Sequence, residues 1–184
     1  MIQLVDQKVE REKVLESRNY IVKGFVEFSD KWLVDYSLKL VAAENSAHPY
    51  GPELLSLIDA FKVVDRPDLK FFAVTCDPDV SDSESVVYQT QITQDDFEEL
   101  IDIFIAYNFL LFSSDLKHAV LFVKTLDFKY LAGSVDFLVT YGGELLRQRD
   151  HFKEFVDNQF RVNAFSPAYL NNLMIAYGKM DYLS

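Results

Sequence analysis

The sequence predicts an α+β protein in which several helices pack on a largely antiparallel sheet with a central hairpin. Strand-like apolar runs are few, helical patterns lie irregularly between them, and two strand-like runs are adjacent in the middle of the chain. This mixture is typical of α+β folds rather than of repeated βαβ units. Because 184 residues with 49% hydrophobic side chains suffice for one buried core, we expect a single globular domain over residues 1–184.

The first third of the chain predicts three helices and one strand. Charges of both signs alternate over 6–18, which indicates a surface helix, and the alternation in 20–28 indicates a strand with a bulge at Gly24. Ser29 is expected to cap a helix that continues to about residue 44, and Pro52 to begin another. Their apolar stripes are Trp32, Leu33, Tyr36 and Leu40, and Leu54, Leu57, Ile58 and Phe61.

The middle of the chain predicts two strands and the clearest amphipathic helix. The apolar run 69–76 indicates an interior strand, 77–85 a loop, and 86–92 a second strand. Thr93 is a suitable N-cap for the helix that follows. Its apolar residues recur at helical spacing and are Phe97, Leu100, Ile101, Phe104 and Ile105.

The last third predicts a hairpin followed by three helices. The runs 108–113 and 118–124 form the hairpin, and a short helix over 135–141 is capped by Ser134 and stops at Gly142 and Gly143. Further helices are expected over about 144–157 and from Ser166 to Tyr177. Aromatic residues expected in the core are Phe109, Phe112, Phe122, Phe128 and Tyr130.

Composition excludes several classes of function. There is no apolar run long enough to span a membrane, and no signal peptide pattern, so we expect a cytoplasmic protein that does not bind membranes. Cys76 is the single cysteine, which excludes an intrachain disulfide and a zinc site built on paired cysteines. A pI near 4.6 argues against nucleic acid as a partner.

The net charge of −11 is concentrated in one quarter of the chain. No Lys or Arg lies between Lys70 and Lys117, and this segment alone carries a net charge of −10. The flanks 1–70 and 117–184 carry −2 and +1. The ten acids of the segment are Asp77, Asp79, Asp82, Glu84, Asp95, Asp96, Glu98, Glu99, Asp102 and Asp115.

Four of these acids form a row on the amphipathic helix, opposite its apolar stripe. Asp95 with Glu99, and Glu98 with Asp102, are like-charge pairs at i and i+4, each destabilising by roughly 0.2–0.5 kcal/mol. Acids in the first turn favour the helix dipole, which accounts for Asp95, Asp96 and Glu98 but not for Asp102. The row is therefore either a solvated face or a docking surface for a basic partner.

Other motifs indicate no chemistry. The loop acids Asp77, Asp79, Asp82 and Glu84 suggest calcium, but the glycine and the twelfth-position glutamate of an EF-hand are missing, so we expect no metal and no cofactor. The histidines form no HxxxH or HExxH motif, and neither GxSxG nor a P-loop occurs. A catalytic Cys76 would need a paired histidine, and packing in an apolar strand is the simpler role. No catalytic residue is predicted, and the histidines are His48, His118 and His151.

One segment carries a resemblance. Phe112 and Ser113 precede a polar turn and the apolar strand Ala119–Val123, and a small-residue step at Gly133 and Ser134 leads into a short helix containing Phe137. This layout resembles that of small bacterial immunity proteins, which neutralise polymorphic or contact-dependent toxins. The similarity covers residues 108–143, about a fifth of the chain. It implies a non-enzymatic, acidic, cytoplasmic inhibitor that plugs the basic active site of a nuclease-like toxin.

The charge distribution predicts a binding protein for a basic partner, and the resemblance implies that this partner is a toxin domain. A small enzyme with an unrecognised carboxylate acid/base site and an oligomer-forming structural subunit are the alternatives. The sequence does not determine the oligomeric state. The predicted partner-binding residues are Asp77, Asp79, Asp82, Glu84, Asp95, Glu98, Glu99 and Asp102.

Overall fold

The computed structural model describes residues 1–24, 26–44, 49–124, 128–162 and 166–180. The helices are α1 (Lys8–Ile21), α2 (Asp30–Asp35), α3 (Pro52–Val64), α4 (Gln94–Phe104), α5 (Val135–Gly142), α6 (Leu145–Val162) and α7 (Pro167–Lys179). The strands are β1 (Gln3–Leu4), β2 (Val22–Lys23), β3 (Glu27–Phe28), β4 (Lys39–Glu44), β5 (Phe71–Thr75), β6 (Val87–Thr90), β7 (Phe109–Ser113), β8 (Ala119–Phe122) and β9 (Phe128–Gly133).

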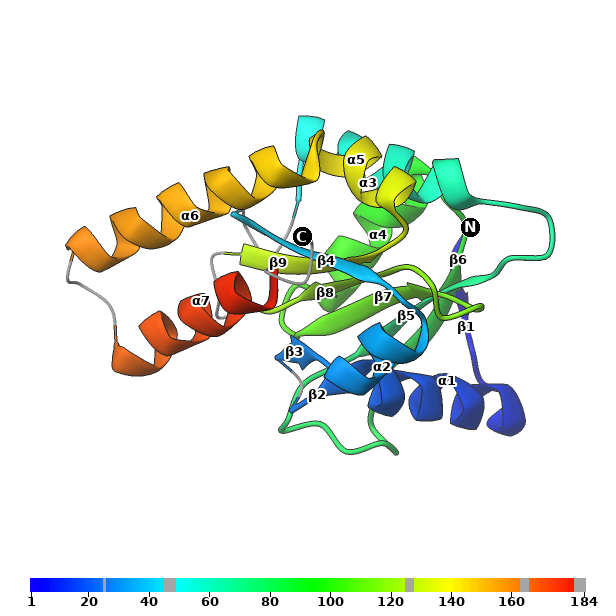
Figure 1. Ribbon diagram of the computed structural model, residues 1–184. Helices are drawn as coiled ribbons and strands as arrows, with labels where there is room; N and C mark the ends of the chain where they lie inside the picture. Colours follow the sequence, from blue (N-terminus) through cyan, green and yellow to red (C-terminus); the bar gives the residue numbers. More distant parts are fainter. Residues whose placement is uncertain (25, 45–48, 125–127, 163–165, 181–184) are drawn as a thin grey trace.

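A seven-stranded sheet organises the described residues, in the order β1-β6-β5-β7-β8-β9-β4. Every pair of neighbouring strands is antiparallel, and the hairpin β7–β8 occupies the fourth and fifth positions. In Figure 1, α1, α2 and the small β2–β3 hairpin lie below the sheet, and α3, α4 and α5 lie above it. The predicted α+β fold with a central hairpin is therefore confirmed.

Successive side chains of the central strands point to opposite faces of the sheet and pack against different helices. Phe71 of β5 has its ring centroid 5.5 Å from that of Phe61 on α3, on the upper face. Its neighbour Phe72 points to the lower face, where it pairs with Phe112 of β7 at 5.9 Å beside Val14 of α1. Side chains of both faces are buried because helices cover the sheet on both sides, which explains the continuous apolar runs of these strands.

A stack of phenylalanine rings ties α4 to the sheet. Phe104 stacks on Phe109 with centroids 4.8 Å apart, and Phe109 stacks on Phe122 at 4.2 Å. All five aromatic residues that the sequence placed in the core are at most 2% exposed. One member of the predicted α4 stripe differs: Ile105 is 52% exposed because the helix ends at Phe104.

The predicted N-caps are confirmed by their hydrogen bonds. Thr93 Oγ1 accepts from the Asp96 N–H at 3.2 Å, and Ser29 and Ser134 cap α2 and α5 in the same way. Ser166, where the last helix was expected to begin, also caps α7. A capping side chain satisfies one of the free N–H groups at a helix start, so these residues fix where the helices begin. The helix predicted over 144–157 is present as α6 and continues to Val162.

The strand predicted over 20–28 is wrong. Helix α1 continues to Ile21, and the following residues turn at Gly24, which has φ 60°, into the two-residue pairing of β2 with β3. Gly24 therefore lies in a turn and not in a bulge. The helical period was hidden because Arg18 occupies a position of the buried stripe, beside Val14 and Ile21.

The helix predicted from Ser29 to about residue 44 is also wrong beyond its first turns. Helix α2 ends at Asp35, Ser37 adopts φ 52°, and the chain enters strand β4. Strand β4 pairs with β9 along six residue pairs, and β9 itself was not predicted. The spacing of Trp32, Leu33, Tyr36 and Leu40 fits a helix by coincidence, and long-range pairing overrides it.

Trp32 joins α2 to the turn of the β7–β8 hairpin. Its Nε1 donates to the Leu116 carbonyl oxygen at 2.9 Å, and its ring lies 5.0 Å from that of Phe28. Leu116 occupies the left-handed region with φ 59°. The indole is fully buried, so this contact fixes α2 against the lower face of the sheet.

Among the helices of the described residues, none combines the length and apolar character that a membrane crossing requires.

Candidate functional site

The first candidate is the row of acids on α4, which we call the α4 carboxylates. They lie opposite the buried stripe formed by Phe97, Leu100, Ile101 and Phe104, and all are exposed to solvent. No Lys or Arg of the described residues forms an ion pair with any of them. The α4 carboxylates are Asp95, Glu98, Glu99 and Asp102.

The fifth acid of the helix, Asp96, has a structural role. It is 4% exposed and accepts hydrogen bonds from the Gln91 N–H at 3.1 Å and from the terminal ammonium of Met1 at 2.7 Å. Burial raises the pKa of this carboxyl, but the hydrogen bonds and the ammonium charge outweigh burial, so its pKa is lowered. Asp96 therefore stabilises the start of α4 and contributes nothing to the exposed row.

The acidic loop, residues 77–84, is held by α1. The guanidinium of Arg18, itself buried, forms an ion pair with Asp82 and donates to the Thr75 carbonyl oxygen at 3.1 Å. Arg11 donates to the backbone carbonyl of Asp82 at 2.7 Å. Glu84 accepts from the Ser81 hydroxyl at 2.6 Å, which lowers the pKa of Glu84. At least two of the four loop carboxylates are thus engaged by the protein's own residues.

The structure does not bring the α4 carboxylates and the acidic loop into one continuous surface. Helix α4 lies above the sheet in Figure 1, whereas the loop is fastened to α1 below it. The two areas approach each other at one end of the sheet, where Asp79 and Glu84 line a small hollow together with Tyr107, just after α4. The predicted set of eight residues therefore separates into two groups of four.

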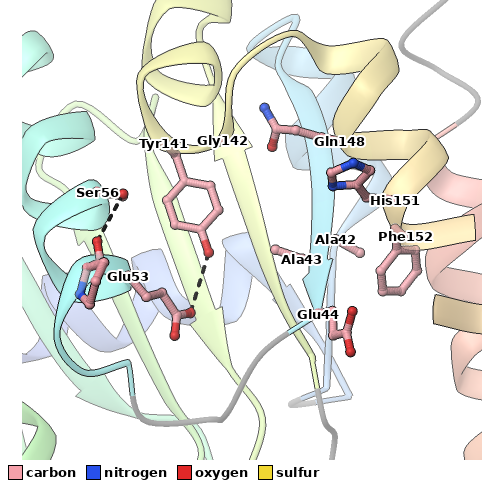
Figure 2. Close-up of a pocket in the computed structure, with 11 residues that line it drawn as sticks. Ala42, Ala43, Glu44, Glu53, Ser56, Tyr141, Gly142, Gln148, His151 and Phe152 are labelled. Carbon is pink, nitrogen blue, oxygen red and sulfur yellow. Dashed lines mark hydrogen bonds between the residues drawn. The ribbon is translucent and has the colours of Figure 1, made fainter. Parts of the chain in front are cut away.

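The second candidate was not predicted: a cavity of about 340 Å³ at the β4 edge, which we call the β4 pocket. Figure 2 shows Ala42 and Ala43 of β4 between two walls, with Glu53 and Tyr141 on one side and His151 on the other. The pocket combines residues from β4, α3, α5 and α6, which are far apart in the sequence. No local motif indicates this pocket, because its walls come together only when β4 pairs with β9 in the folded chain.

A buried ion pair lies behind one wall of the β4 pocket. Lys129 of β9 is fully buried, and its Nζ contacts the Glu53 carboxylate, whose side chain is 15% exposed. The Tyr141 hydroxyl lies 3.5 Å from the same carboxylate oxygen. Burial lowers the pKa of Lys129 to about 7, whereas the adjacent carboxylate favours the charged ammonium. The sequence analysis did not single out Lys129, although its place between the apolar residues Phe128 and Tyr130 could have indicated a buried charge.

Gln148 fixes the rim of the β4 pocket. Its Nε2 donates to the carbonyl oxygens of Leu138 at 2.9 Å and Gly143 at 2.7 Å, so α6 is joined to the end of α5. A Cβ at Gly142 would approach the Gln148 side chain to 2.7 Å, which explains the glycine. The wall that carries Tyr141 is therefore held in place by hydrogen bonds and not only by apolar packing.

The single cysteine packs in the core. Cys76 is fully buried at the end of β5, and burial raises the pKa of its thiol to about 12. A thiol with a raised pKa is a poor nucleophile at neutral pH. Of the three histidines, His48 lies outside the described residues, His118 precedes β8, and His151 lines the β4 pocket.

His118 is expected to make stability depend on pH. Its ring lies 5.3 Å from that of Phe137, and its Nδ1 is buried without a hydrogen-bond partner among the described residues. Burial lowers the pKa of His118 below its ordinary 6.5, against the opposing charge of Asp115. The unfolded chain therefore takes up a proton before the folded one. The free energy of unfolding should fall as pH decreases from about 7, by up to about 1.4 kcal/mol per pH unit.

Urea unfolding of the parent and of His118→Leu between about pH 7 and pH 5 checks this expectation. The variant should lose that part of the pH dependence, and the exposed control His151→Gln should keep it. Equal slopes for the parent and His118→Leu would contradict the assignment.

A scan against protein-family models, a search of curated proteins and a search of solved structures found no match for this chain.

Proposed function

We propose that the protein is a non-enzymatic binding protein that docks a basic protein on the α4 carboxylates. The observation that carries this proposal is the exposure of all four carboxylates on one helix, with no ion pair to any described Lys or Arg. Like charges at i and i+4 destabilise a helix, so these four acids lower the stability of α4 and are not explained by folding. Complementary charge on a partner would offset that loss of stability and would accelerate association.

The proposed partner is a toxin domain with a basic active surface, such as a nuclease-like domain, and the proposed site of action is the cytoplasm. An acidic helix can occlude such a surface in place of the phosphates that a nuclease binds. The similarity of residues 108–143 to immunity proteins supports the same choice. In this chain that segment supplies the hairpin β7–β8, strand β9 and the capped helix α5.

Capture from the native cell, followed by a salt titration, tests the proposal. A charge-reversal variant carries Lys in place of all four α4 carboxylates. Its control carries Lys in place of four exposed acids on α5 and α6, so that the change in net charge is equal. The control positions are Asp136, Asp150, Glu154 and Asp157.

We expect the parent and the control to hold a basic protein that salt releases, and the α4 variant to associate about tenfold or more slowly at low salt. The captured protein, expressed alone, should be toxic, and the parent chain should relieve that toxicity. An α4 variant that binds the partner as well as the parent at low salt would sink the proposal.

A small enzyme is the second candidate, and the β4 pocket is the observation that favours it. The pocket is concave, and a carboxylate in its wall contacts a lysine whose pKa is lowered, a combination that is frequent in active sites. The same combination also occurs in structural ion pairs, and the Ser56 hydroxyl that lines the pocket donates to the Pro52 carbonyl oxygen at 3.0 Å and not to a general base. We therefore keep docking as the leading function.

A further inference from the structure

The side chains that line the β4 pocket carry a net negative charge. Two carboxylates line it, those of Glu44 and Glu53, whereas no Lys or Arg is among its lining residues in the described parts of the chain. Lys129 compensates Glu53 from behind and does not itself line the pocket. Glu44 is exposed and has no ion pair with a described residue. A positively charged ligand would therefore meet net negative charge at this site.

Glu53 retains capacity to accept hydrogen bonds. The contacts from Lys129 and Tyr141 both go to Oε1, and no described residue donates to Oε2. A carboxylate can accept about four hydrogen bonds, so a second donor can reach this group from the cavity.

Aromatic and small apolar side chains complete the pocket. Rings of Tyr141 and Phe152 line it, and aromatic faces attract cations. Ala42 and Ala43 of β4 leave room for an apolar stem between the two walls, as Figure 2 shows. The volume of about 340 Å³ lies within the range of small-molecule sites, which begins near 300 Å³.

We infer that the β4 pocket binds a small organic cation: an ammonium or guanidinium group on a short apolar stem, with the charge held between Glu53 and Glu44. A free amine and a Lys or Arg side chain of another protein present the same chemistry. The inference does not depend on the proposed docking at α4, because the pocket is built from β4, α3, α5 and α6.

The test uses butylamine as the probe and butanol as its uncharged counterpart, followed in amide NMR spectra of the full chain. Millimolar butylamine should shift the resonances of Ala42, Ala43 and Glu44 in a saturable manner, and butanol should not. Absence of saturable shifts with butylamine, or equal shifts with butanol, would overturn the inference.

Variants locate the charge. Glu44→Gln should weaken butylamine binding about threefold, as expected for an exposed carboxylate. The double variant Glu53→Gln/Lys129→Met removes both buried charges together and should weaken binding about tenfold. Glu16→Gln, at an exposed glutamate on α1, is the matched control and should change nothing. A double variant that remains folded and binds butylamine as tightly as the parent would overturn the inference.

A further arm distinguishes the two sources of the cation. N-acetyl-lysinamide carries the same ammonium on a peptide-like backbone, and N-acetyl-norleucinamide lacks the charge. Binding of the lysine derivative as tight as that of butylamine indicates a site for a protein side chain, whereas much weaker binding indicates a site for a free amine. Both results retain a cation site, and equal binding of the norleucine derivative contradicts it.

Discussion

Replacement of Glu53 by Gln alone is expected to lower the free energy of unfolding by about 3–5 kcal/mol, because it leaves the Lys129 ammonium buried without a counter-charge. Lys129 is fully buried on β9, so water cannot replace the lost carboxylate. Lys129 can respond instead by releasing its proton. Because burial lowers the pKa of Lys129, the decrease in the free energy of unfolding should be smaller at high pH. Urea unfolding followed by circular dichroism measures the change.

The double variant Glu53→Gln/Lys129→Met shows whether the loss comes from the unpaired charge. It removes both charges and keeps an oxygen for the Tyr141 hydroxyl, so its stability should return close to that of the parent. Lys8→Met, which breaks an exposed pair with Glu12, is a control that should change little. If Glu53→Gln alone is as stable as the parent, the ion pair does not contribute as the structure implies.

Replacement of Phe61 by Ala should lower the free energy of unfolding by about 3–5 kcal/mol. The Phe61 ring is fully buried on α3, with centroids 5.5 Å from Phe71, 5.9 Å from Phe97 and 5.0 Å from Phe137. It therefore joins α3 to β5, α4 and α5 at once. Truncation opens a cavity that these rings cannot close, since each is held by its own strand or helix.

The matched control for Phe61 lies on the same helix. Leu55 is 47% exposed, so Leu55→Ala keeps the helix and removes little buried surface. Phe61→Leu should lose less than Phe61→Ala, because the smaller change leaves a smaller cavity. Equal losses for Phe61→Ala and Leu55→Ala would contradict the position of Phe61 at the centre of the core.

Helices with an uninterrupted apolar period were predictable from the sequence, and so were the central strands. Helix α4 carries its stripe on one face and a capping Thr93 before it, so pattern and cap agree. Strands β5 and β7 are buried throughout, and apolar except for a last Thr or Ser, because both of their faces are covered. Helix α1 was predicted too short because the buried guanidinium of Arg18 satisfies its charge through tertiary contacts that local pattern does not show.

Edge strand β4 was not predictable, since its identity depends on pairing with β9 and not on its own alternation. The β4 pocket depends on the same pairing and was missed for that reason. For the acids, the helical wheel placed the α4 carboxylates on the exposed side, but nothing local indicated that Asp82 of the acidic loop binds Arg18 below the sheet. Whether an acid of this segment is exposed or forms an ion pair therefore depends on long-range contacts.

The position of Trp32 gives the protein an intrinsic optical reporter. It is the single tryptophan of the chain, it is fully buried, and its indole N–H is hydrogen-bonded to Leu116. Emission excited at the red edge of the absorption band therefore arises from one site, between α2 and the turn of the β7–β8 hairpin. A red shift of the emission maximum would show that this contact has opened. Trp32 belongs neither to the lining of the β4 pocket nor to α4, so a ligand in the pocket or a partner on α4 should leave the emission maximum unchanged.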